Sequence, residues 1–118
     1  MHDFKKLDVW EKSMKLAEEV YSITNQFPDG EKYGLTSQMR RCSVSIPSNI
    51  AEGAGRNGDK EFANFLSISL GSAFELETQL LLSARLKFVE ETIIENILVE
   101  LDSICKMLHV LKKRLTKI

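Results

Sequence analysis

The side chains best suited to catalysis or metal binding are scarce in this 118-residue sequence and stand far apart. It has two histidines, His2 and His109, and two cysteines, Cys42 and Cys105. A di-iron centre in a helical bundle needs Glu-x-x-His on two helices, and the residue three before His109 is Lys106. The sequence also has no Walker loop, no dinucleotide-binding glycine pattern and no Cys-x-x-Cys. It therefore predicts no metal site, no cofactor and no enzymatic activity.

One glycine-rich segment, Gly53-Ala54-Gly55-Arg56-Asn57-Gly58, is similar to a phosphate-binding loop in its glycine content. A P-loop ends in Gly-Lys-Ser or Gly-Lys-Thr and follows a strand, whereas this segment lacks that ending and follows a predicted helix. Its glycines suit the end of a helix and the turn after it. We interpret the segment as a helix C-cap and turn.

Positive charge is the remaining chemical signal. On the last predicted helix, Lys106, Lys113 and Lys117 lie on the face away from the apolar seam. Cations near a helix C-terminus also complement the helix dipole, so a solvated face is the alternative interpretation. As a functional site, they would contact nucleic-acid phosphates without sequence specificity. The candidate nucleic-acid-binding residues are Lys106, Lys113, Arg114, Lys117, Arg40 and Arg56.

The elements that must position these residues are helices, because apolar residues recur at spacings of three and four along four segments. Asp8, Asp59 and Thr92 stand where N-terminal capping residues would. Short links between helices force neighbours to run antiparallel. The predicted fold is all-α, an antiparallel up-down-up-down four-helix bundle forming a single domain, 1–118. Its expected helices cover about residues 8–26, 33–54, 59–85 and 92–118.

The helix expected at 8–26 has two apolar stripes on nearly opposite sides, more than one intramolecular core can cover. The helix expected at 59–85 likewise carries apolar residues about a quarter-turn from its core stripe. Exposed apolar patches usually mark an interface, so we expect a homo-oligomer. The alternative is that wide stripes meet two neighbouring helices within one bundle. The predicted interface residues are Val9, Leu16, Val20, Ile23, Phe27, Leu70, Phe74 and Leu81.

A polar stripe runs along the helix expected at 33–54 at the same helical spacing. It is either a solvated face or a surface that hydrogen-bonds a partner subunit or ligand, since short serine and asparagine side chains permit close approach. The stripe consists of Gln38, Arg41, Ser45, Asn49 and Glu52.

Composition is typical of one compact core, with 43% hydrophobic and 28% charged residues. Sixteen basic and seventeen acidic residues give a net charge of -1, which removes any global attraction to polyanions. Both cysteines fall on apolar helical positions, as expected of reduced thiols in a core. The N-terminus has no apolar stretch of signal-peptide length, and no run of about 18 apolar residues occurs. We expect a cytoplasmic protein without membrane contact.

The segment Ser45-Ile46-Pro47-Ser48-Asn49-Ile50-Ala51-Glu52-Gly53 resembles the signature of the four-helix bundle proteins encoded in intervening sequences of bacterial 23S ribosomal RNA genes. The resemblance covers nearly the whole chain, most weakly the last helix. It implies a bundle that assembles as a homopentamer, and it carries no assigned enzymatic activity. The accessory protein of diversity-generating retroelements is similar in fold and binds nucleic acid and reverse transcriptase. Further matching residues are Phe4, Leu7, Val9, Trp10, Phe27-Pro28, Tyr33-Gly34-Leu35, Gln38, Arg40-Arg41, Gly71-Ser72 and Glu75-Leu76-Glu77.

Two function hypotheses follow. The first is a non-enzymatic, self-assembling scaffold that contacts RNA or a ribonucleoprotein through its weakly basic face. The alternative is an oligomeric helical bundle that binds a protein or small ligand and has no nucleic-acid role.

Overall fold

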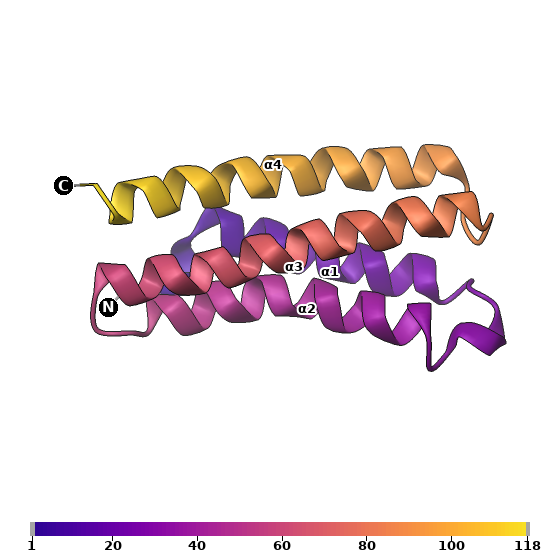
Figure 1. Ribbon diagram of the computed structural model, residues 1–118, viewed down its shortest axis with the longest axis horizontal. Helices are drawn as coiled ribbons and strands as arrows, with labels where there is room; N and C mark the ends of the chain where they lie inside the picture. The colour runs from indigo at the N-terminus through magenta and orange to yellow at the C-terminus, as the bar shows by residue number, and fades with distance from the viewer. Residues whose placement is uncertain (1, 118) are drawn as a thin grey trace.

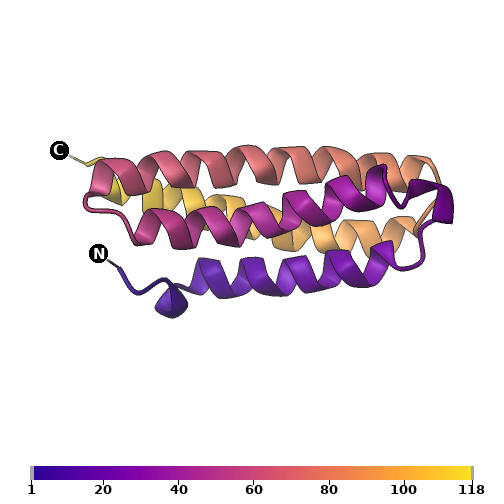
Figure 2. The same ribbon diagram turned by 90° about the horizontal axis from the view of Figure 1, so that it is seen from below.

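A computed structural model describes residues 2–117 as four long helices lying side by side (Figure 1). Successive helices run in opposite directions, so the start of the first helix, the second interhelical turn and the end of the last helix share one end of the bundle (Figure 2). The predicted all-α, up-down-up-down four-helix bundle is confirmed, and residues 2–117 contain no strand. The helices are α1 (Asp8–Thr24), α2 (Leu35–Ala54), α3 (Asp59–Arg85) and α4 (Glu91–Leu115), with short 3-10 helices η1 (Phe4–Lys6) and η2 (Asp29–Glu31) before α1 and α2.

The helix ends differ from the prediction in their capping. Asp8, Asp59 and Thr92 lie inside the first turns of their helices, and none acts as a capping residue. The carboxylate that binds the start of α2 comes from η2, where Glu31 Oε1 accepts the N–H of Leu35 at 3.0 Å. Acidic side chains in the first turns still complement the helix dipoles. Residues 1 and 118 of the predicted domain lie outside the described part of the chain.

One hydrophobic core runs through the bundle and takes side chains from all four helices. Leu16, Met39, Leu76 and Leu108 are among its fully buried members. Neighbouring helices pack in the order α1, α2, α3, α4, and the seam between α1 and α4 is the thinnest of the four. Helices α1 and α2 therefore form one side of the bundle, and α3 and α4 form the opposite side. No helix within residues 2–117 is long and apolar enough to cross a bilayer.

Helices α2 and α3 make the most extensive interhelical contact in the bundle, and small residues allow their backbones to approach closely. A Cβ added to Gly53 would lie 2.7 Å from Cβ of Phe65 and 2.9 Å from a ring carbon of Phe62. Further along the pair, Ser69 Oγ donates to the carbonyl of Ile46 at 2.9 Å. The glycine at 53 is thus required by the close approach of two helix backbones.

Candidate functional site: the interaction surfaces

The structure inverts the predicted roles of the two apolar stripes of α1. Val9, Leu16, Val20 and Phe27 were assigned to an oligomer interface, yet they are 0–6% exposed in the single chain and belong to its core. Ile23 is partly buried against the same core. The assignment of Val9, Leu16, Val20 and Phe27 to an interface is wrong because aliphatic and phenyl groups have no polar atom to keep in water, so they gain most from burial. The assignment of Ile23 stays a prediction.

The opposite stripe of α1 faces outward and forms a groove with α2. Met14 and Tyr21 of α1 are 38% and 43% exposed, and Val44 of α2 is 41% exposed. The groove has a volume of about 600 Å³ and a mainly apolar lining, in which Glu18 carries the single charge. Helix α1 therefore leaves one stripe uncovered, although not the predicted one. The lining residues are Phe4, Trp10, Met14, Ala17, Glu18, Tyr21, Val44, Pro47, Ser48 and Ala51.

The α2 wall of this groove was missed by the sequence analysis. Its apolar members, Val44, Pro47 and Ala51, follow one another at spacings of three and four directly beside the polar stripe. That periodicity is the signal that could have revealed the groove.

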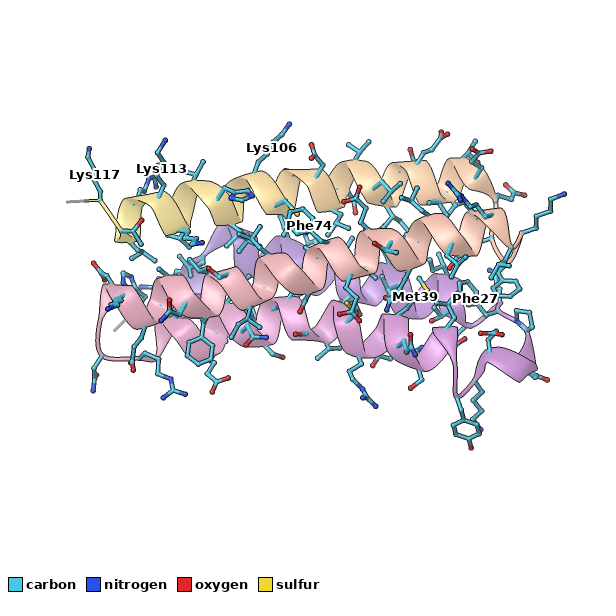
Figure 3. The ribbon with its side chains drawn as sticks, in the orientation of Figure 1. Phe27, Met39, Phe74, Lys106, Lys113 and Lys117 are labelled. Carbon is cyan, nitrogen blue, oxygen red and sulfur yellow. The ribbon has the colours of Figure 1, made fainter. Side chains whose placement is uncertain are left out.

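On the other side of the bundle, α3 exposes large apolar side chains. Phe74 is 52% exposed and Leu81 45% exposed, and Figure 3 shows Phe74 between α3 and α4. Leu81 also lines a hollow of about 490 Å³ between these helices, together with Leu98. Leu70, by contrast, is only 5% exposed, so its assignment to an oligomer interface is wrong. Apolar surface thus remains uncovered on two opposite sides of the bundle.

The polar stripe of α2 divides between internal contacts and solvent. Ser45 Oγ shares a 2.9 Å hydrogen bond with Ser72 Oγ of α3, and Asn49 Nδ2 donates to the Ser45 carbonyl at 2.8 Å. Ser45 therefore joins α2 to α3, whereas Asn49 is held within α2. Gln38 and Arg41 are exposed, and their side chains make no hydrogen bond or ion pair within residues 2–117.

Two candidate cations, Arg40 of α2 and Arg56 of the turn after it, are engaged in local contacts. Arg40 Nε donates to Thr24 Oγ1 at 2.9 Å, and its guanidinium lies 4.7 Å from the ring centroid of Tyr21. Arg40 therefore ties α2 to the end of α1 and does not join the cations of α4. Arg56 pairs with Glu52, the last member of the polar stripe, at 3.0 Å.

The candidate cations of α4 do gather on one helix. Lys106, Lys113 and Lys117 point away from the bundle along the outer side of α4 (Figure 3). Lys106 is paired with Asp102 at 3.1 Å, whereas Lys113 and Lys117 have no ion pair within residues 2–117. Arg114 lines a hollow of about 370 Å³ between α4 and the start of α1.

Three titratable groups within residues 2–117 have pKa values raised by burial. At the α1–α4 seam, burial, a hydrogen bond with Glu100 and the charge of Glu100 raise the pKa of Glu19 to about 7. Burial also raises the pKa of both thiols, to about 12 for Cys42, so Cys42 and Cys105 stay protonated. Both cysteines are buried and free. Within residues 2–117, no group of three or more His, Cys, Asp or Glu side chains is placed to hold a metal ion.

Comparison with known proteins supports the family resemblance that the segment at 45–53 indicated. None of the curated proteins matches the chain. A crystal structure of a protein of unknown function from the S23 ribosomal protein family of Bacteroides thetaiotaomicron is similar, with a TM-score of 0.82 and 27% identity over 89% of this chain and 95% of that one. The profile of a family described as 23S rRNA-intervening sequence protein matches residues 5–110, which include the signature segment at 45–53. The chain therefore belongs to the 23S rRNA-intervening sequence protein family.

Proposed function

We propose that this protein is a non-enzymatic scaffold that assembles with copies of itself. The observation that carries the proposal is the apolar surface left on two opposite sides of the bundle. Met14, Tyr21 and Val44 are exposed at the α1–α2 groove, and Phe74 and Leu81 are exposed on the α3–α4 side. Contiguous apolar patches on a folded domain usually mark interaction sites. Burying the exposed half of each such side chain contributes roughly 1 kcal/mol.

The proposed contact places the α3–α4 side of one copy in the α1–α2 groove of the next. Two different surfaces then meet, so the contact is heterologous and must either close into a ring or continue as a filament. A closed ring is the soluble outcome. Five copies is the number that the family resemblance implies, and we adopt a homopentameric ring as the proposed assembly.

A non-enzymatic role is supported by the state of the strongest potential nucleophiles. Both thiols are buried, and their raised pKa values keep them protonated at neutral pH. The exposed surface of the fold is apolar in some places and charged in others, and such surfaces can bind partner molecules.

Light scattering on paired variants tests the heterologous contact. Met14→Glu places a charge in the groove, and Phe74→Glu places one on the opposite side, so each variant alone should be monomeric with its helical content retained. Mixed together, they should form a dimer and stop there, because one intact groove meets one intact α3–α4 side. Asn57→Glu in the exposed α2–α3 turn is the control and should assemble normally. Monomeric wild-type protein, or no dimer on mixing, contradicts the proposal.

Contact with RNA or another nucleic acid is a second candidate function. It is favoured by the lysines that point outward along α4, Lys106, Lys113 and Lys117 (Figure 3). Such a surface binds phosphates through charge and gives little sequence preference. Retention of RNA that falls steeply as salt rises would support it, and a salt-insensitive ligand would favour a purely protein-binding or small-ligand bundle.

A further inference from the structure

Charge is strongly separated along the bundle, although the whole chain is nearly neutral. Dividing each helix at its midpoint gives one half made of residues 2–15, 46–71 and 104–117, with eleven basic and six acidic side chains. The other half, residues 16–45 and 72–103, has five basic and eleven acidic side chains. The bundle is 47 Å long, and its two halves carry side-chain charges of +5 and -6. We call the first half the basic end.

Three segments that are far apart in the sequence meet at the basic end. The N–H of His2 donates to the carbonyl of Ala54 at 2.9 Å, and the His2 ring lies 5.1 Å from that of Phe62. These contacts hold the N-terminal segment beside the α2–α3 turn. The same segment borders the end of α4, because Asp8 and Arg114 line one hollow. The cations of η1, of the start of α3 and of the end of α4 therefore share one end of the molecule.

Most cations at the basic end are free to bind a ligand. The ion pairs of Lys and Arg within residues 2–117 are Arg56–Glu52 and Lys106–Asp102, and Nε2 of His2 lies 3.9 Å from Oδ1 of Asp59. The cations that make no such pair at this end are Lys5, Lys6, Lys12, Lys15, Lys60, Lys112, Lys113, Arg114 and Lys117.

Complementation of helix dipoles does not account for this separation. It explains the basic last turn of α4, where Lys112, Lys113 and Arg114 lie at the negative end of the helix. Helices α1 and α3 begin at the basic end, and both have acidic side chains in their first turns. Those acidic side chains alone would make that end negative. The end is strongly positive in spite of them, so the excess of cations has another cause.

We propose that the basic end binds the phosphate backbone of a polynucleotide. The proposal deepens the nucleic-acid candidate function above and rests on it, but it moves the site from the side of α4 to the end of the bundle. The cross-section of the bundle measures 23 × 20 Å. That width spans several backbone phosphates, which follow one another at about 3.4 Å along each strand of a duplex. The aromatic rings nearby are partly buried, so base stacking contributes little.

The salt dependence of binding follows from the number of phosphates neutralised. Four or five contacts to a single strand give a slope of about -3 to -3.5 in a plot of log affinity against log salt. Binding should then weaken about 100-fold between 50 and 200 mM salt.

The experiment measures binding of fluorescent 20-nucleotide oligo(U), with heparin as a second polyanion, by anisotropy across a salt series. The test variant combines Lys5→Glu, Lys60→Glu and Lys117→Glu, one change from each segment. The control combines Lys32→Glu, Arg85→Glu and Lys87→Glu at the other end, with the same change in net charge. The test variant should lose at least 100-fold in affinity for oligo(U) at 50 mM salt, and the control less than 3-fold.

Several results would overturn the proposal. They also distinguish a failure of binding at the basic end from a failure of nucleic-acid binding in general. If both triple variants lose affinity for oligo(U) equally, net charge alone controls binding and the proposal fails. If Lys106→Glu with Lys113→Glu abolishes binding and the test variant does not, the site is the side of α4 and only the end-binding proposal fails. Wild-type protein that binds heparin but not oligo(U) overturns the nucleic-acid assignment altogether. Circular dichroism of each variant checks that the fold is intact.

Discussion

Two glycines on paired helices should respond in opposite directions to the same change to alanine. At Gly53, the added methyl group would meet Cβ of Phe65 at 2.7 Å and the Phe62 carbonyl oxygen at 3.3 Å, so α2 and α3 must move apart. Overpacking of this kind costs about 3 kcal/mol, of which better helix propensity offsets about 1. At Gly71, exposed in the middle of α3, a Cβ meets nothing within 4 Å. Gly71→Ala should therefore stabilise by about 0.5–1 kcal/mol.

Thermal and urea unfolding followed by circular dichroism measure both effects. In a chain of this size, 1 kcal/mol corresponds to roughly 4 °C in the melting temperature. Gly53→Ala should melt about 8 °C below the wild type, and Gly71→Ala a few degrees above it. Each curve is recorded at two protein concentrations, so that a change in assembly is not mistaken for a change in fold. If Gly53→Ala melts with the wild type, the close approach of α2 and α3 is wrong.

Three further predictions concern single side chains. The raised pKa of Glu19 means that the folded state keeps a proton that the unfolded chain releases near the ordinary pKa of 4.5, so stability should fall as pH rises from about 4.5 to 7. Glu19→Gln should remove this loss of stability with pH. At pH 8 it should raise the free energy of unfolding by about 1 kcal/mol, after allowance for solvent screening. Thermal melting at pH 5 and pH 8 measures both effects. Arg40→Ala should cost about 1–2 kcal/mol in urea unfolding, and Arg41→Ala less than about 0.5. Leu16→Ala should cost about 2–5 kcal/mol in monomer stability, whereas Met14→Ala should chiefly weaken assembly in light scattering.

The fold could be predicted from the sequence because local signals agreed with one another. Apolar spacing, short links and the glycine-rich turn all indicated four antiparallel helices, and α3 has the bounds expected. The ends of α1 and α2 were less accurate, since they depend on contacts between segments. Arg40 binds Thr24 at the end of α1, and Glu31 binds the start of α2 from four residues away. Such contacts leave no periodic trace in the sequence.

The interaction surfaces were predictable only in part. The two stripes of α1 were visible, but helical spacing cannot say which of them faces the core. The polarity of the side chains distinguishes the core stripe from the surface stripe. Val9, Leu16 and Val20 form a purely aliphatic stripe, while Trp10 and Tyr21 on the other side carry polar atoms that favour a surface position. The charge separation was hidden for another reason. Cations from three distant segments combine only after the antiparallel arrangement brings one end of each helix together.

Charge separation also constrains the symmetry of an assembly. In a ring whose bundles stand parallel to the rotation axis, every copy points the same way, so all basic ends lie on one face and repel their neighbours. In a two-fold pair with antiparallel bundles, each basic end would lie beside an acidic one and attract it. Salt screens both effects, with a Debye length of about 10 Å at 0.1 M. Apolar burial in the α1–α2 groove must therefore outweigh like-charge repulsion in a ring. It follows that added salt should strengthen a ring, while it would weaken an antiparallel pair.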